Sequence, residues 1–475
     1  PDSEKDAEIC HRAIILKNFS INEQYKTELE TILQATDYES AEARVVKIKY
    51  KQKDNRYTNF FRNFKFFYTK ISELSDSRLN SIAKAITDNC EVIEIKSWQV
   101  EQAITMFNSL NSDGLPLYDS DIISAKLYAA AERIGKESVF SNSWKQLGDI
   151  ISELETFGIA DINSILMQYM YYIRTINHET ISDTGAVNVT TPGLRRYFTE
   201  INKGPISDPL KMCTDMIKLS KIWKKVSDYP QIKVLLKFNE NSKLFLASYF
   251  FRFNEEDITA EIVEPIVDCL LRLFSLLELG DAGYSSKYFK TFLFKEEAKF
   301  SDETIPVEEI KTDFYQHIIS NWDYDTIDAA LHDYDGNALV YLNEYLFAKE
   351  TAVSFTLEAK CDIEHIMPHS GNNLQEIRTD AEIESEAEFI GVVNKLGNKI
   401  LLEEKINRSI GNEWFRTKVS TKLENKTGYI DSKYPIACAL VAQYQNKNKP
   451  YWKKGDIAAA TDKASERIAK FIFGN

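Results

Sequence analysis

CDIEHIMPHS, residues 361–370, and NKLGNKILLEEKINRSIGN, residues 394–412, are the two ends of the stretch around which the chain is organised. Glu364 stands next to His365 in the first end, and Asn407 lies in the second. Hydrolysis of a phosphodiester needs a base that deprotonates water and a divalent metal with oxygen ligands. A histidine accepts a proton near neutral pH, and carboxylate and amide oxygens suit Mg²⁺ or Mn²⁺. The stretch therefore predicts a metal-dependent hydrolytic site.

Zinc is the alternative metal that these residues raise. His365 and His369 are four positions apart, as in a helical zinc pair, but Pro368 between them breaks a helix. Cys361 has no second cysteine nearby, so a tetrahedral sulfur site is not supported. A hard metal is therefore favoured over zinc.

The acidic-His-Ile-x-Pro pattern at 364–368 is followed by Asn-Lys-Ile-Leu at 398–401 and by Asn-Arg nine positions after Asn398. This order resembles the HNH, or ββα-metal, nucleases, and in particular the HNH domain of the CRISPR RNA-guided nucleases. The resemblance implies that His365 is the general base, that Asn398 orients it through backbone contacts, and that Glu364 and Asn407 are metal ligands. Many HNH nucleases have Asp at the position of Glu364, so nearby Asp362 is kept as an alternative ligand.

Ordinary structural roles compete with this assignment. A single histidine is usually a surface or core residue, and asparagines beside glycine usually form turns. We interpret Asn394 and Gly397 in that way, as turn and packing residues. Five identities in one order and spacing favour the nuclease site for the rest.

Composition limits the class of protein. The chain has 475 residues, 44% of them hydrophobic, which predicts two or three domains with an ample core. Six cysteines without paired spacing indicate free thiols in a reducing compartment. A formal charge of −14 argues against a protein that coats nucleic acid unspecifically. No signal peptide or apolar membrane span is present, so we expect a soluble, cytoplasmic protein.

The N-terminal part mixes helices with short strands. We expect two helices within 8–36, a strand at 43–51 and another at 90–98, because the last two are rich in β-branched residues. The aromatic run at 57–74 predicts a helix. Its aromatic residues, interleaved with Arg62 and Lys65, could stack on bases, but burial preferences favour a core role.

A second resemblance follows in 101–131, where a helix, a turn and a new helix capped by Asp119 or Ser120 are expected. Phe-x-x-Leu-Asn-Ser-x-Gly-x-Pro-Leu, followed by Asp-Ile-Ile, resembles the end of the nucleotide-dependent half of the GmrSD-type modification-dependent restriction enzymes, which pair this half with an HNH half. The matching residues are Phe107, Leu110, Asn111, Ser112, Gly114, Pro116, Leu117, Asp121, Ile122 and Ile123. Asp113 and Ser124 depart from the residues that the family often has there.

The Asp-Gly-Gln-Gln-Arg motif, which that family uses in handling nucleotide, is absent from this sequence. We expect it to precede Pro1 in a longer chain. No nucleotide-binding residue is therefore assigned, although the resemblance implies a nucleoside triphosphate acting through the N-terminal half.

Helical patterns fill 132–323, including amphipathic runs at 159–176 and 258–279, and 324–349 adds a last helical stretch. A helix is expected at 412–426, and a closing helix from Trp452 onward. Between Lys395 and Lys426 eight basic residues stand against four acids, a reversal of the chain's charge that predicts a phosphate-binding face. The residues expected to bind DNA are Arg408 above all, with Lys399, Lys405, Arg416 and Lys418.

These features predict a mainly α-helical, multi-domain chain with small α/β parts: a remnant of a nucleotide-dependent regulatory domain at 1–135, a helical middle at 136–323, and a ββα-metal HNH nuclease domain embedded in helices at 324–475. The predicted function is metal-dependent hydrolysis of double-stranded DNA, with restriction of modified phage DNA under nucleotide control implied by the resemblance. Two alternatives stay open: a sensor of DNA modification with an inactive nuclease fold, and a nuclease for RNA or single strands. The sequence leaves a homo-oligomer open as well.

Overall fold

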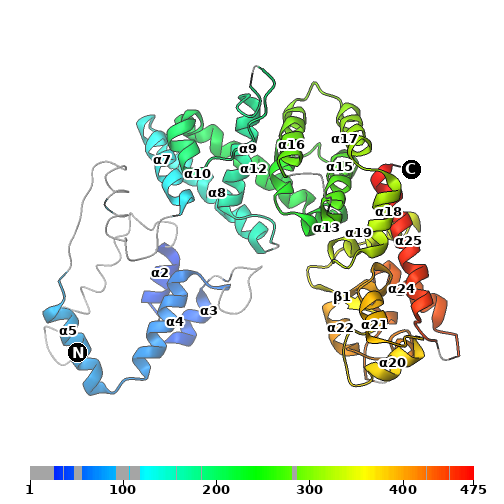
Figure 1. Cartoon of the computed structure of the whole chain (residues 1–475). Helices are drawn as coiled ribbons and strands as arrows, with labels where there is room; N and C mark the ends of the chain where they lie inside the picture. Colours follow the sequence, from blue (N-terminus) through cyan, green and yellow to red (C-terminus); the bar gives the residue numbers. More distant parts are fainter. Residues whose placement is uncertain are drawn as a thin grey trace. The chain divides into compact units, whose positions relative to one another are not determined.

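The chain forms two compact units, Pro1–Phe107 and Asn108–Asn475. A computed structural model describes residues 26–35, 37–45, 47, 56–91, 106, 118–156, 158–182, 184–280, 286–423, 425–448 and 450–474. In these residues the fold is mainly helical, with one two-stranded sheet in the second unit (Figure 1). The predicted mainly α class is confirmed. The predicted domain boundaries remain predictions.

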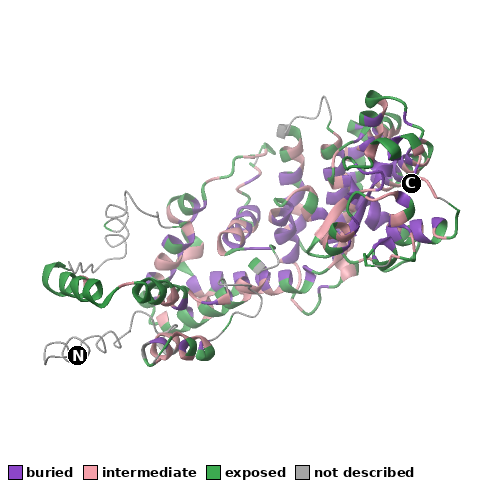
Figure 2. Cartoon of the chain, turned by 90° about the horizontal axis from the view of Figure 1, so that it is seen from below, coloured by how far each residue is buried: buried purple, intermediate pink, exposed green. Residues whose placement is uncertain are grey.

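The first unit has a small core. Its described helices are α2 (Lys26–Leu33), α3 (Tyr38–Arg44), α4 (Asn59–Ser72) and α5 (Asp76–Asn89). α4 confirms the helix expected from the aromatic run, and Thr58 caps its first turn. Phe61 is buried as predicted, but Phe66 and Phe67 are 57% and 59% exposed, so the core interpretation is wrong for these two rings. α5 has no buried residue, and Figure 2 shows the contrast with the buried helices of the second unit.

Most of the strand and motif residues predicted for this region lie outside the described residues. Ala43 and Arg44, the first residues of the strand expected at 43–51, belong to α3, so that strand is wrong at its start. Residues 48–51 and 92–98 lie outside the described residues, as do the matching positions from Phe107 to Leu117.

The second unit begins with successive helices, as the sequence predicts for 132–323. α7 starts at Asp119, but its N-cap is Tyr118, whose backbone N–H donates to Asp121 Oδ2, so neither Asp119 nor Ser120 is the cap. The helices are α7 (Asp119–Arg133), α8 (Glu137–Thr156), α9 (Ile162–Ile176), α10 (Leu194–Arg196), α11 (Gly204–Ser207), α12 (Pro209–Val226), α13 (Pro230–Phe238), α14 (Ser242–Phe250), α15 (Ala260–Leu279), α16 (Ser286–Ser301) and α17 (Val307–Asn321).

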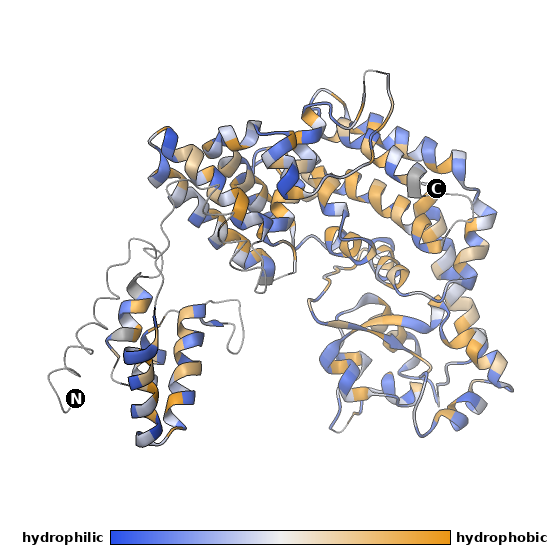
Figure 3. Ribbon diagram, turned by 60° about the vertical axis from the view of Figure 1, so that its left-hand side comes forward, coloured by the Kyte–Doolittle hydropathy of each residue, from blue (hydrophilic) through white to orange (hydrophobic). Residues whose placement is uncertain are grey.

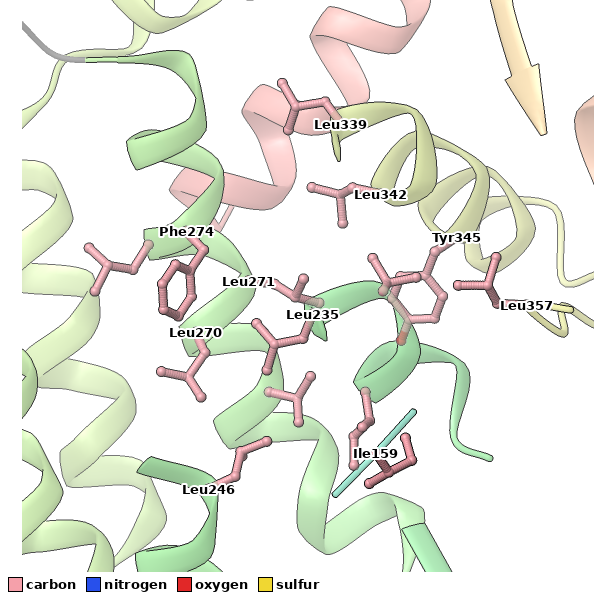
Figure 4. Packing of buried hydrophobic residues seen from close by; sticks show 14 of the residues in the cluster. Ile159, Leu235, Leu246, Leu270, Leu271, Phe274, Leu339, Leu342, Tyr345 and Leu357 are labelled. Atoms are coloured by element: carbon pink, nitrogen blue, oxygen red, sulfur yellow. The ribbon is translucent and has the colours of Figure 1, made fainter. Parts of the chain in front are cut away.

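The hydrophobic faces of these helices form one core with the helices that follow. Figure 3 shows the apolar residues gathered on the inner sides of the long helices. In Figure 4, Leu235 of α13, Leu271 of α15 and Leu342 of α19 meet in this core. Burial of apolar side chains is the main favourable term in folding, so the helical middle and the region after residue 324 are joined by packing.

The C-terminal part contains the only sheet among the described residues. Its elements are α18 (Tyr324–Asp333), α19 (Ala338–Glu350), β1 (Cys361–His365), α20 (Leu374–Asp380), α21 (Glu386–Val393), β2 (Lys399–Glu403), α22 (Glu404–Ile410), α23 (Phe415–Lys418), α24 (Pro435–Tyr444) and α25 (Lys454–Phe473). β1 and β2 are antiparallel, with Glu364 opposite Ile400 and His365 opposite Lys399. α22 follows β2 directly and packs on both strands.

Of the two helices predicted near the C-terminus, one is wrong and one is confirmed. The helix expected at 412–426 is wrong, because only Phe415–Lys418 is helical before the low-propensity residues Val419, Ser420 and Thr421. The closing helix is confirmed as α25, with Ile457, Ile468 and Ile472 buried as predicted. None of the helices in the described ranges is long and apolar enough to cross a membrane.

Candidate active site

The strand–strand–helix arrangement brings the predicted site residues into one region. His365 is the last residue of β1, Asn398 ends a short 3-10 turn (Leu396–Asn398) directly before β2, and Asn407 lies on α22. Because β1 and β2 are paired, two segments more than thirty residues apart in sequence meet at His365 and Lys399. The tertiary structure thus assembles what the sequence motif lists in order.

The imidazole of His365 is half-buried and oriented by a neighbouring side chain. Its Nε2 lies 3.1 Å from Oδ1 of Asn394, the C-cap residue of α21. An amide oxygen only accepts hydrogen bonds, so Nε2 carries the proton and Nδ1 holds the lone pair. Burial lowers the pKa of His365 below its ordinary value, while the hydrogen bond to Asn394 acts in the opposite direction. The ring is therefore neutral at pH 7, as a base requires.

Asn398 is fully buried and binds the chain directly after His365. Its Oδ1 accepts from the Met367 backbone N–H at 2.8 Å and from Trp452 Nε1 at 3.1 Å. Its Nδ2 donates to the carbonyls of Met367 and Val393, at 3.0 and 2.8 Å. Three of these four hydrogen bonds are to backbone groups, those of Met367 and Val393.

The two carboxylates of β1 have different partners. Asp362 and Glu364 are two positions apart on the strand and point to the same face. Asp362 Oδ2 accepts from Asn407 Nδ2 at 3.0 Å. Glu364 Oε1 instead accepts from the ammonium of Lys418 and from the hydroxyl of Tyr429, the latter at 3.1 Å. The carboxylate beside Asn407 is therefore that of Asp362.

Asp362 and Asn407 have the chemistry of a hard-metal site. A flip of the Asn407 side-chain amide would exchange its oxygen and nitrogen. The oxygen, in place of the nitrogen, would then face the same space as the Asp362 carboxylate. Mg²⁺ is usually held by one or two carboxylates, with waters and substrate phosphates as the other ligands. Within the described ranges no group of three or more His, Cys, Asp or Glu residues could hold a metal. The two oxygen donors thus fit a metal that shares its coordination with substrate.

The basic residues expected to bind DNA divide into exposed and buried ones. Lys405, Arg408 and Arg416 are exposed. Arg408 pairs with Glu404, and the Arg416 guanidinium lies 4.2 Å from the centroid of the Trp414 ring.

Lys399 and Lys418 require a correction, because both are buried. Lys399 Nζ donates to the carbonyls of Asp335 and Gly336, at 2.5 and 3.0 Å, and burial lowers its pKa. Burial also lowers the pKa of Lys418, whose side chain has no exposed surface. Neither ammonium is available to a DNA backbone.

The sequence alone missed three residues of this region. The sequence predicts a turn for Asn394 and DNA binding for Lys418, and it carries no signal for Tyr429. Asn394 could have been noticed because it stands four positions before Asn398, within one helical turn of the second motif. No sequence signal marks the pairing of Lys418 and Tyr429 with Glu364, because these residues are 54 and 65 positions from it.

Comparison with known proteins covers the same part of the chain. Residues 284–466 match the family model described as GmrSD restriction endonucleases, C-terminal domain. No curated protein and no solved structure matches. The match includes β1, β2 and α22, and the resemblance of residues before 284 remains a prediction. Through residues 284–466 the chain is therefore similar to the C-terminal domain of the GmrSD restriction endonucleases.

Proposed function

We propose that the C-terminal domain is an HNH-type endonuclease that hydrolyses DNA phosphodiester bonds with the help of a divalent metal. The observation that carries the proposal is the arrangement of β1, β2 and α22, in which a neutral, oriented histidine ends β1 while Asp362 meets Asn407 of α22. An acyl or glycosyl transfer would need a different set of groups. A base together with a hard-metal site suits phosphodiester hydrolysis.

The metal is Mg²⁺ or Mn²⁺, and Asp362 and Asn407 would hold it. When bound, it supplies positive charge that stabilises the phosphate and the leaving 3′ oxygen. Glu364, the ligand that the motif resemblance implies, has its Oε1 occupied by Lys418 and Tyr429. This geometry favours Asp362, the alternative that the sequence left open.

In the proposed mechanism His365 removes a proton from the attacking water through Nδ1. Asn394 keeps the ring from turning, because its Oδ1 accepts the proton-bearing Nε2–H at 3.1 Å. Asn398 holds the backbone after His365 by its two hydrogen bonds to Met367. Both asparagines act on the base and not on the phosphate.

The DNA contact would involve the exposed side of α22. Lys405 and Arg408 are exposed on this helix, which also carries Asn407. Positively charged side chains beside the reacting phosphate neutralise the backbone and set the strand's position. Arg416, whose guanidinium lies over the Trp414 ring, is a third exposed cation, on the following segment.

The biological role that fits the family is restriction of modified phage DNA. The support is the match to the restriction endonuclease family, together with the similarity of residues 107–123 to the nucleotide-dependent half. Regulation by a nucleoside triphosphate through that half is part of the same proposal.

Cleavage of DNA by the full chain tests the enzyme. Duplex plasmid, modified phage DNA and RNA are each incubated with Mg²⁺ or Mn²⁺, with and without nucleoside triphosphate. We expect duplex cleavage that His365→Ala reduces by about 10²-fold or more, the usual contribution of a general base. His369→Ala, an exposed histidine four residues later, is the matched control and should keep most of the cleavage.

A wild-type chain that cuts none of these substrates would count against the enzyme and in favour of a sensor. Cleavage of RNA alone would change the substrate class. Equal cleavage by His365→Ala and the wild type would overturn the assignment of the base.

A further inference from the structure

Lys418 is a buried cation directly behind the candidate base. It ends α23, its side chain is 0% exposed, and the side chain of its partner Glu364 is 9% exposed. Burying an ammonium is costly unless it is paired with an anion and its other protons are hydrogen-bonded. Lys418 meets both conditions, since its Nζ donates to Glu364 Oε1, to the His365 carbonyl at 2.9 Å and to the Ile366 carbonyl at 3.2 Å.

The acceptors of the Lys418 ammonium include the backbone that carries His365. An ammonium has three protons, and two of those of Lys418 bind backbone carbonyls of His365 and the next residue. Asn398 binds Met367, the residue after these, through both its N–H and its carbonyl. The backbone from 365 to 367 is thus held by Lys418 and Asn398 together, so the direction in which the imidazole leaves β1 depends on both side chains.

Glu364 takes part in this network through Oε1. Besides Lys418 it accepts the hydroxyl of Tyr429, a fully buried residue. A divalent cation on the same carboxylate would lie beside a buried ammonium, and like charges repel strongly where the dielectric is low. Asp362, on the same face of β1, has a neutral partner in Asn407. A metal bound there faces no such repulsion from its carboxylate's partner.

We propose that Lys418 is a positioning residue that holds the backbone of His365, that Glu364 is its counter-ion, and that Asp362 in place of Glu364 joins Asn407 in holding the metal. The inference rests on the proposed nuclease function for its metal and its reaction. The pairing of Lys418 with Glu364 is independent of that function.

The ligand assignment is tested by titrating the full chain with Mn²⁺ in a calorimeter, without DNA. We expect Asp362→Asn to weaken Mn²⁺ binding by about 10-fold or more, and Glu364→Gln to change it by less than about 3-fold, because only the first removes a ligand charge. Loss of Mn²⁺ binding in Glu364→Gln, with binding retained in Asp362→Asn, would overturn the assignment. A wild type that neither binds Mn²⁺ nor cleaves DNA would instead contradict the proposed function.

The ion pair is tested by thermal unfolding of Lys418→Met, Glu364→Gln and the double variant. We expect Lys418→Met to lower the Tm by on the order of 10 °C, because it leaves a buried carboxylate without its cation. The double variant should lose less than the sum of the two single losses, because neither charge remains. Additive losses would overturn the pairing, whatever the metal experiment gives.

The positioning role is tested by the kinetics of the double variant at a temperature where it is folded. We expect kcat to fall by about 10-fold or more with KM for DNA unchanged, since the base is displaced while the DNA surface is intact. Lys233→Met is the matched control, because Lys233 is a half-buried lysine that also donates to a backbone carbonyl, that of Leu357, away from the site. A folded double variant with wild-type kcat would overturn the positioning role.

Discussion

His365 is served by two asparagines that act on different parts of it. Asn394 accepts from the ring, and Asn398 holds the backbone of Met367 two residues later. The ring contact determines the tautomer and the rotation of the imidazole. The backbone contacts determine the position of the main chain that carries it. Under the proposed mechanism, loss of either contact would leave His365 present but wrongly oriented, which lowers the rate more than it weakens substrate binding.

Replacement of Asn394 tests the ring contact. We expect Asn394→Ala to lower kcat by roughly 10- to 100-fold, the usual effect of removing a partner that orients a catalytic group, with little change in KM. Steady-state cleavage of duplex DNA with Mn²⁺ measures both constants. Asn373→Ala, an exposed asparagine whose side chain makes no cap hydrogen bond at the start of α20, is the matched control. If Asn394→Ala cleaves like this control, the ring does not depend on Asn394.

At the scale of elements, the site depends on the contact between α25 and the turn before β2. Gly397 of that turn lies against α25, where an added Cβ would be 2.3 Å from the Thr461 backbone nitrogen and 2.4 Å from the Ile457 carbonyl. Its own N–H donates to Thr461 Oγ1 at 3.1 Å. The neighbouring residue is Asn398, so the last helix of the chain presses directly on the turn that holds the segment after His365. α25 also packs on α15, α18 and α19 of the helical core.

A methyl group at Gly397 should therefore separate these elements. We expect Gly397→Ala to lower the free energy of unfolding by about 2 kcal/mol or more, because the clash is with backbone atoms that cannot turn aside, and to reduce DNA cleavage with it. Gly391→Ala is the control, since an added Cβ there meets nothing within 4 Å and Gly391 lies inside α21. Chemical denaturation of the two variants measures the difference. Equal stability would show that α25 yields at this contact.

On the scale of the whole molecule, buried acids inside the helical core make its stability depend on pH. Glu297 of α16 and Glu344 of α19 have no exposed surface. Burial raises the pKa of each to about 8, although Ser248 donates to Glu297 and the Ile436 N–H donates to Glu344. Both carboxyls are therefore protonated in the folded protein at neutral pH, whereas in the unfolded chain they ionise near pH 4.5.

The sign of the pH dependence follows from this difference. Between about pH 4.5 and pH 8 the folded state holds more protons, so the stability that each group contributes is full below the lower value and is lost as pH rises through about 8. The loss is at most about 1.4 kcal/mol per pH unit for each group. Denaturation of the wild type and of Glu297→Gln at pH 5 and pH 8.5 measures it. We expect the free energy of unfolding to fall less in the variant than in the wild type between pH 5 and pH 8.5. An equal fall in the two proteins would contradict a protonated Glu297.

Local patterns were sufficient for much of the fold. The helices from 132 onward, α4 and α25 were predictable because each has an apolar face at helical spacing. The prediction of a helix at 412–426 was wrong because its charged residues indicated a solvated helix. Lys418 is instead buried, and its ammonium donates to two carbonyls and a carboxylate that lie 52 to 54 positions away in the sequence. The prediction that Phe66 and Phe67 are buried was wrong for a different reason. Hydrophobicity favours burial, but it does not supply the surface that would cover a ring.

The sequence by itself determined the class of fold and the order of the residues proposed for the site, because residue identity and spacing are local properties. The tertiary structure alone decided how those residues are divided: Asp362 faces Asn407, Glu364 neutralises Lys418, Lys399 is buried, and Asn394 orients His365. Each of these depends on contacts between segments far apart in the chain. Such contacts are determined by the packing of β1, β2, α22 and the segments after them, and no local pattern encodes which acid meets which base.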